Sequence, residues 1–229
     1  MTAFPANPEV SRSVARRLLE AGCVEVRRDE PYRLPSGWAS PVYMDCRRLI
    51  SFPAIRRELV QQSLDLLREH GVTGNLDAVA GAEASGIAMA AWLADALDLP
   101  MQYVRKKPKG FGPATQVEGV MRAGERVLLV DDVMAGGQSQ AAFQRAIAGV
   151  GATMENALVI FDYGVFPTGA LLGPLRVKVH ALATWRDVLV LARETATFAP
   201  AALAELEEFL GDPVRWSHAH GGIPAAHAN

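Results

Sequence analysis

Cysteine is scarce in this sequence of 229 residues, which contains only Cys23 and Cys46. Two cysteines are too few for a disulfide framework, and their separation matches neither a C-x-x-C redox motif nor the usual spacing of zinc ligands. The scarcity argues against a small disulfide-stapled secreted protein and indicates the reducing environment of the cytoplasm.

Long apolar runs are also missing. No stretch approaches the roughly 18 consecutive apolar residues that a membrane-spanning helix requires. Residues 1–13 do not combine a basic start with an apolar core, as a secretory signal would. We therefore expect neither a membrane segment nor a targeting signal.

Neither sign of charge is in excess. The sequence has 23 lysines and arginines against 25 aspartates and glutamates, which gives a formal net charge of -2. Such a balance creates no global attraction for nucleic acid or anionic membranes, so any anion site must be local. Half of the residues are apolar, which is enough for the core of one large domain or of one domain with a small extension.

Two familiar nucleotide-binding motifs are absent. The sequence contains no G-x-x-x-x-G-K-[ST] segment, and GAEASG at residues 81–86 lacks the glycine pattern G-x-G-x-x-G. The sequence therefore does not support a P-loop nucleotidase or a dinucleotide-dependent dehydrogenase.

The apolar pattern that is present predicts an α/β fold. Amphipathic helices are predicted over residues 9–22 and 52–71, on either side of a segment of turns and short strands at 32–47. Short apolar strands and helices then alternate. Strands are predicted at 76–82, 100–107, 126–132, 156–164 and 176–185, and helices at 85–99, 138–151 and 200–212. This alternation is typical of a central, mostly parallel sheet flanked by helices.

Two adjacent carboxylates, Asp131 and Asp132, end the predicted strand at 126–132, and the loop that follows contains Gly136 and Gly137. In a parallel sheet, ligands bind at the carboxyl ends of the strands. Because strand side chains alternate, one carboxylate is expected to face the crevice and the other to bond a neighbour. Unpaired N–H groups at the start of the next helix would hold a phosphate. The combination favours a sugar phosphate, although solvated acids at an ordinary strand–helix connection remain an alternative.

A basic run follows the predicted strand at 100–107. It comprises Arg105, Lys106, Lys107 and Lys109, and it enters a glycine-containing stretch that continues to Gly124. Such a stretch is too long for a simple connector. A basic run alone is most often a solvated surface, but beside a sugar-phosphate site it predicts a mobile lid that clamps a polyanionic leaving group.

Three segments carry a resemblance to a known family. VLLVDDVMAGGQS at residues 127–139 resembles the motif with which type I phosphoribosyltransferases bind phosphoribosyl pyrophosphate (PRPP). YVRKKPKGFG at 103–112 is similar to the basic loop of the orotate phosphoribosyltransferases, and LPSGWASPVYMDCR at 34–47 is similar to part of their orotate pocket. The matches lie in the family's order and span roughly residues 32–163.

The resemblance implies a type I phosphoribosyltransferase fold and a set of site residues. The implied organisation is a base-binding hood within residues 1–73, a core at 74–216 with a C-terminal extension, and a flexible tail at 217–229. The implied catalytic residues are Asp131, Asp132 and Lys109. The implied PRPP contacts are Ala84, Ser85, Arg105, Lys106, Lys109, Asp131, Asp132, Val133, Met134, Ala135, Gly136, Gly137, Gln138 and Ser139, and the implied orotate contacts are Tyr43, Met44, Ala135 and Tyr163.

The implied partners are PRPP and orotate, with Mg2+ bound mainly through oxygens of PRPP rather than in a protein metal site. A homodimer with the lid acting on the neighbouring subunit is also implied, with no nucleic-acid or membrane partner. Tyr163 departs from the family pattern, because an arginine often meets the orotate carboxylate there. Another donor would have to replace it, and the candidates are backbone N–H groups near residues 40–44 or the nearby Arg47. Two alternatives stay open: a phosphoribosyltransferase for another base, and a regulatory protein that senses PRPP on the same fold.

Overall fold

The computed structural model describes residues 3–27, 30–34, 36–108 and 116–222. Its centre is a seven-stranded sheet with the order β1-β11-β10-β9-β6-β7-β8. All neighbouring strands are parallel except the pair β7 and β8. The strands are β1 (Ala3–Pro5), β6 (Ala78–Ala82), β7 (Met101–Val104), β8 (Val117–Glu118), β9 (Arg126–Met134), β10 (Thr153–Asp162) and β11 (Lys178–Thr184). This sheet confirms the predicted α/β fold.

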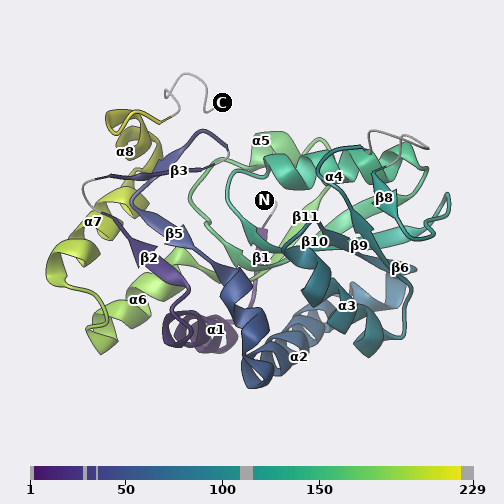
Figure 1. Cartoon of the computed structure of the whole chain (residues 1–229), viewed down its shortest axis with the longest axis horizontal. Coiled ribbons are helices and arrows are strands. Elements are labelled where there is room, and N and C mark those ends of the chain that lie inside the picture. The colour runs from purple at the N-terminus through teal and green to yellow at the C-terminus, as the bar shows by residue number, and fades with distance from the viewer. Residues whose placement is uncertain (1–2, 28–29, 35, 109–115, 223–229) are drawn as a thin grey trace.

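Helices cover both faces of the sheet (Figure 1). They are α1 (Pro8–Glu20), α2 (Pro53–Glu69), α3 (Gly86–Leu97), α4 (Gln138–Gly149), α5 (Gly169–Leu172) and α6 (Trp185–Thr195), with a short 3-10 helix η2 at Thr73–Asn75. Leu128 and Val130 of β9 pack in the core that contains α1, α2 and α3, whereas Leu129 packs in the core that contains α4 and α5. A strand buried on both faces reads as a continuous apolar run, which is why β9 was recognisable from the sequence.

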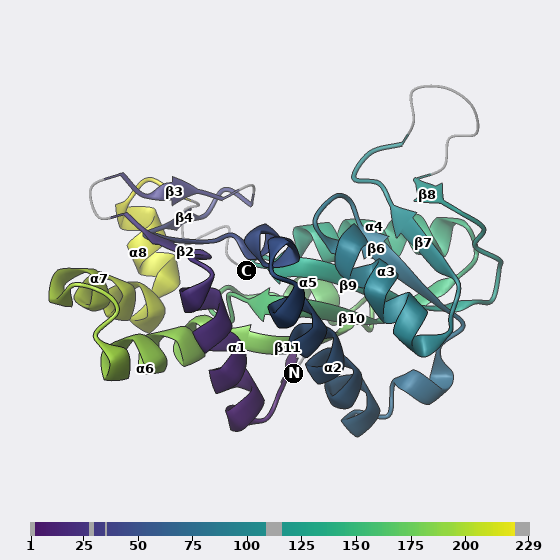
Figure 2. The same cartoon turned by 60° about the horizontal axis from the view of Figure 1, so that its bottom comes forward.

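The hood is built from two small antiparallel sheets and a 3-10 helix. Its elements are β2 (Val24–Val26), β5 (Val42–Met44), β3 (Tyr32–Arg33), β4 (Ala39–Ser40) and η1 (Cys46–Ser51). The C-terminal helices α7 (Pro200–Gly211) and α8 (Pro213–Ala219) lie beside it (Figure 2). The backbone N–H of Ala39 donates a buried hydrogen bond of 2.8 Å to Ser217 Oγ.

Several boundaries differ from the sequence predictions, and three of them matter for the fold. Residues 1–73 do not form a separate unit, because β1 pairs with β11 and α1 packs on β11. The flexible tail predicted from Ser217 is wrong for the first of its residues, because Ser217 is buried in α8, which continues to Ala219. Residues 223–229 of this prediction lie outside the described residues. The strand predicted to run through Trp185 ends at Thr184, where a capping box between Thr184 and Asp187 starts α6.

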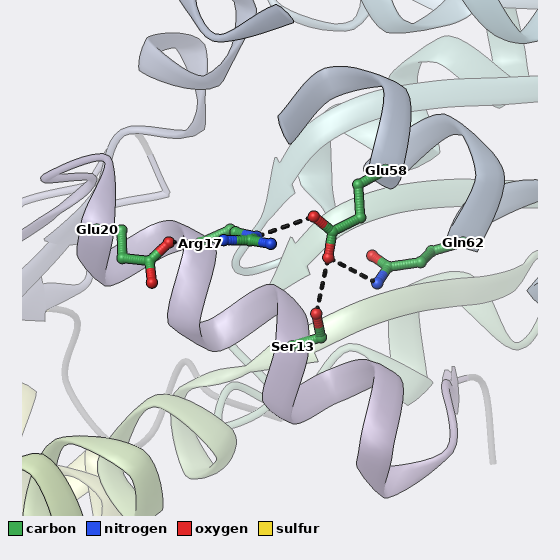
Figure 3. Close-up of polar contacts among 5 residues, drawn as sticks. All are labelled: Ser13, Arg17, Glu20, Glu58 and Gln62. Atoms are coloured by element: carbon green, nitrogen blue, oxygen red, sulfur yellow. Dashed lines mark hydrogen bonds and ion pairs between the residues drawn. The ribbon is translucent and has the colours of Figure 1, made fainter. Parts of the chain in front are cut away.

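A polar cluster joins α1 to α2 (Figure 3). Glu58 of α2 accepts hydrogen bonds from Ser13 Oγ at 2.8 Å and from Arg17 Nε at 2.9 Å, and Gln62 Nε2 adds a third at 3.4 Å. Because α2 starts directly after η1, this cluster also fixes the base of the hood. Within the described ranges, no helix is long and apolar enough to cross a membrane.

Candidate active site

A cavity of about 290 Å3 lies between the hood and the carboxyl end of β9. Four parts of the chain form its walls: the hood, the loop between β6 and α3 with the start of the basic run, the segment from the end of β9 into α4, and Tyr163 directly after β10. The lining residues are Leu34, Ser36, Tyr43, Met44, Arg47, Glu83, Ser85, Lys106, Asp131, Asp132, Val133, Ala135, Gly136, Gly137, Gln138, Ser139, Gln140 and Tyr163.

Asp131 is the buried member of the carboxylate pair, with 7% of its surface exposed. Its Oδ1 accepts hydrogen bonds from the backbone N–H of Asp132 at 2.9 Å and from Ser85 Oγ at 3.3 Å, and its Oδ2 accepts one from Gln140 Nε2 at 3.1 Å. Burial, together with the neighbouring Asp132 carboxylate, raises the pKa of Asp131. Asp131 is therefore an anchor that connects β9 with α3 and α4.

Asp132 is the more open member of the pair. Its side chain is half-buried, and its Oδ1 accepts a hydrogen bond from the backbone N–H of Val133 at 2.8 Å. No other hydrogen bond to this carboxylate comes from the described residues, so its Oδ2 is available to hydroxyl groups in the cavity.

The loop between β9 and α4 is the segment for which the sequence predicts a phosphate seat, and it lines the cavity. Gly137 precedes α4 with a φ of +78°, a left-handed conformation that favours glycine. Ala135, Gly136 and Gly137 line the cavity together with Gln138, the first residue of α4. The first N–H groups of a helix lack intrahelical partners and carry the positive end of its dipole, so this segment suits a phosphate.

The loop before α3 approaches β9 closely. A Cβ atom on Gly86 would lie 2.1 Å from the Val130 carbonyl oxygen, so only glycine fits where α3 starts. This approach places Ser85 on Asp131. On the other side of the loop, Glu83 Oε2 accepts a hydrogen bond of 2.8 Å from the backbone N–H of Lys106, which ties the start of the basic run to the cavity.

Tyr163 forms part of the hood-side wall but is only 2% exposed. Its ring packs against Phe161, Phe166 and Trp185. Its hydroxyl donates a long hydrogen bond of 3.4 Å to the Val42 carbonyl oxygen, and burial raises its pKa, which keeps it neutral. Tyr163 therefore brings no charge to the wall.

The structure brings most of the predicted site residues together. Of the predicted set, the cavity is lined by Tyr43, Met44, Ser85, Lys106, Asp131, Asp132, Val133, Ala135, Gly136, Gly137, Gln138, Ser139 and Tyr163. Ala84, Arg105 and Met134 do not line it, and Arg105 forms an ion pair of 3.7 Å with Glu118. Lys109 lies outside the described residues.

Four lining residues were not named from the sequence: Leu34, Ser36, Glu83 and Gln140. Arg47, which also lines the cavity, was named as a candidate partner for the orotate carboxylate. Leu34 and Ser36 lie in the segment 34–47 that carries the resemblance, so their proximity to the site had a signal in the sequence, whereas Glu83 lies outside the three segments. Gln140 lies in the first turn of α4, and only the folded chain shows that its side chain turns back to Asp131.

The fold and this cavity define a phosphoribosyltransferase. A family model described as "Phosphoribosyl transferase domain" matches residues 54–163. The solved orotate phosphoribosyltransferase of Aeropyrum pernix is similar, with a TM-score of 0.66 and 30% identity over 80% of this chain and 99% of that one. The solved UMP synthase of Leishmania donovani superposes with a TM-score of 0.73 and 25% identity over 88% of this chain and 42% of that one.

Sequence relatives narrow the class. An orotate phosphoribosyltransferase of Dinoroseobacter shibae is 48% identical over 95% of this chain and 96% of the relative, and one of Rhizobium meliloti is 44% identical over 97% of each. The chain belongs to the orotate phosphoribosyltransferase family. The resemblance seen in the sequence is thereby confirmed.

Proposed function

We propose that this protein transfers the 5-phosphoribosyl group of PRPP to orotate, forming orotidine 5′-monophosphate and pyrophosphate, a step in the synthesis of UMP. The observation that carries this proposal is one cavity in which a carboxylate pair adjoins a phosphate seat and faces a separate wall with aromatic residues. Carboxylates accept hydrogen bonds from hydroxyls, N–H groups bind phosphate, and a flat ring fits against Tyr43.

Each wall of the cavity then has one task. The loop from Ala135 into α4 binds the 5′-phosphate, and Asp132 accepts hydrogen bonds from the ribose hydroxyls. Ser85 and Lys106 bind the pyrophosphate, and Arg105 and Lys109 join them when the basic loop closes. Hood residues Tyr43 and Met44, with Ala135 and Tyr163, hold the base against the anomeric carbon.

The chemistry requires alignment and electrostatic stabilisation rather than a covalent enzyme intermediate. As the bond from the anomeric carbon to the pyrophosphate oxygen breaks, positive charge develops on the ribose ring and negative charge on the leaving group. The Asp132 carboxylate lies on the ribose side, and the cations of the basic run lie on the leaving-group side, so the charges of the site match those of the transition state. The orotate ring nitrogen, held by the hood, attacks from the opposite face and loses its acidic proton to solvent, so the site needs no strong general base.

The donor set suits Mg2+ that arrives with PRPP. No three His, Cys, Asp or Glu side chains cluster as a metal site in the parts of the chain that the structure describes. Two adjacent carboxylates at an open cavity nevertheless suit a hydrated ion that is bridged mainly by substrate oxygens. When bound, Mg2+ neutralises charge on the leaving pyrophosphate.

The proposed assembly is a homodimer in which each basic loop closes over the neighbouring subunit's site. Ile50 and Phe52, between η1 and α2, are exposed large apolar side chains. A second copy of this chain would cover them, and this position beside the hood brings two cavities near one interface. The two cysteines are free and buried, which fits the proposed cytoplasmic location.

An assay with PRPP, Mg2+ and orotate tests the function, with the loss of the orotate ultraviolet band as the measurement. We expect turnover with orotate and none with uracil, hypoxanthine or adenine. Turnover with one of those bases instead of orotate would support the alternative enzyme. Binding of PRPP without turnover of any base would support the regulatory protein.

A further inference from the structure

We infer that Arg47 binds the carboxylate of orotate and so determines the preference for orotate over uracil, an inference that rests on the proposed function. Orotate is uracil with a carboxylate on the ring carbon next to the reacting nitrogen. A carboxylate enclosed by protein needs a cationic or hydrogen-bonding partner, because leaving it unpaired is costly. The residue that supplies this partner is therefore a specificity determinant.

Two cationic side chains line the cavity within the described residues, Arg47 and Lys106. They lie on different walls. Lys106 starts the basic run, and its backbone is held by Glu83 in the loop before α3. Arg47 belongs to η1, directly after β5, which also carries Tyr43 and Met44. Arg47 is thus the cation on the base-binding wall.

The guanidinium of Arg47 is held in place but not saturated. Its Nε donates to Asp45 Oδ1 at 2.6 Å, and its Nη2 donates to Tyr43 Oη at 3.2 Å. These contacts use two of its five N–H donors, so three remain for a ligand. The side chain is 56% exposed, so a substrate carboxylate can reach it without displacing core residues.

Stacked side chains in the hood fix the tyrosine that bonds Arg47. The ring of Tyr43 stacks on the ring of Tyr32, with 5.3 Å between the two centroids. The guanidinium of Arg27 lies over the Tyr32 ring, 4.3 Å from its centroid. Tyr32 Oη also donates to Glu25 at 2.7 Å. Because these contacts position Tyr43, it can hold both the base and the arginine that recognises the base.

The rest of this wall does not offer an equivalent charge. Tyr163 is neutral, and its hydroxyl already bonds the Val42 carbonyl. Leu34 and Met44 are apolar, and the Ser36 hydroxyl, which has no partner among the described residues, is uncharged. Arg47 is therefore the side chain with the right chemistry at the right wall.

A pair of nucleotides isolates the carboxylate, because orotidine 5′-monophosphate and UMP differ only in that group. We expect the wild type to bind orotidine 5′-monophosphate more tightly than UMP in calorimetric titrations. In Arg47→Gln, affinity for orotidine 5′-monophosphate should fall about 10- to 100-fold, the range for a charge-assisted hydrogen bond. Affinity for UMP should stay within about twofold. Arg47→Lys should retain part of the preference, because it keeps the charge but loses the planar donor pair.

Arg68→Gln is the matched control. Arg68 is 55% exposed and pairs with Asp65 at 3.1 Å, as Arg47 pairs with Asp45, but it lies near the C-terminal end of α2 and does not line the cavity. This variant should bind both nucleotides as the wild type does. Thermal unfolding of all three variants, together with UMP binding, reports whether the fold is intact.

Three results would overturn the inference. The first is an equal loss of affinity for both nucleotides in a folded Arg47→Gln variant, and the second is a loss confined to PRPP, which would place Arg47 at the phosphates. The third is an unchanged preference for orotidine 5′-monophosphate. If the wild type itself bound neither nucleotide and turned over no orotate, the proposed function would fail instead.

Discussion

Ser85 Oγ lies 3.3 Å from Asp131 Oδ1, and this hydrogen bond joins the loop before α3 to the end of β9. One side of the pair belongs to the wall assigned to pyrophosphate, and the other belongs to the wall assigned to ribose. Asp131 therefore organises the site from within, whereas Asp132 is the more open carboxylate at the cavity. Substitution of the two carboxylates should separate these tasks.

Asp132→Asn should lower kcat/KM about 10- to 100-fold, because a charged acceptor of ribose hydroxyls becomes a neutral one. Its unfolding temperature should match that of the wild type. Asp131→Asn should lower both kcat/KM and stability, the latter by about 1–3 kcal/mol, because an amide cannot accept from all the donors that surround Asp131. Steady-state kinetics and urea unfolding check both. Identical behaviour of the two variants would contradict the division of tasks.

Two substitutions of Tyr163 test whether this position has a structural role or can carry a charge. Tyr163→Phe should cost no more than about 1 kcal/mol in stability, because its hydrogen bond to Val42 is long. Tyr163→Arg should cost at least about 3 kcal/mol, because a guanidinium would replace a ring that is 2% exposed. Urea unfolding measures both. A stable Tyr163→Arg variant with tighter orotate binding would show that the cavity can accept the charge at this position.

The free energy of unfolding should depend on pH through His180, a buried residue of β11. Burial, with added effects of His70 and Lys178, lowers its pKa to about 4 in the folded protein, against about 6.5 in the unfolded chain. At pH values between these two pKa values, His180 binds more protons in the unfolded chain than in the folded protein, so its contribution to stability rises with pH. The contribution of neutral His180 is complete above about pH 6.5 and is lost as the pH falls toward 4, by about 2 kcal/mol between pH 7 and pH 5.

The pKa values of Asp131 and Asp162 are raised by burial, and these groups give a slope of the opposite sign. The measurement is therefore a difference: urea unfolding of the wild type and of His180→Gln from pH 7.5 to pH 5. The stability gap between them should narrow as the pH falls. His218→Gln, an exposed control, should follow the wild type. A gap that stays constant with pH would contradict the neutral, buried state of His180.

Subunit mixing tests the proposed lid in trans. Lys109→Ala and Asp132→Asn should each be nearly inactive as homodimers. A heterodimer would contain one site with both lesions and one with neither. Random exchange makes about half of the dimers heterodimeric, so about a quarter of wild-type activity should return. No recovery, with heterodimers verified by mass, would show that each lid serves its own subunit.

Local pattern predicted the sheet and the floor of the site because β9, its carboxylates and its glycine loop are contiguous in the sequence. Contacts between distant segments were not predictable in that way. No sequence feature near Ala39 indicates that its backbone N–H donates a hydrogen bond to Ser217. Arg105 illustrates a different limit: it is adjacent to Lys106 in one basic run, yet it pairs with Glu118 while Lys106 lines the cavity. Charge clusters in a sequence do not specify the direction of each side chain.

The hydrogen bond between Ala39 and Ser217 joins the hood to α8, so the hood can be completed only after α8 has been synthesised. All strands of the central sheet have left the ribosome once β11, which ends at Thr184, has emerged. The helices that support the hood, α7 and α8, emerge later. A growing chain can therefore build the floor proposed for the sugar phosphate before it can fix the hood proposed for the base, so the hood is the last part of the site to be completed.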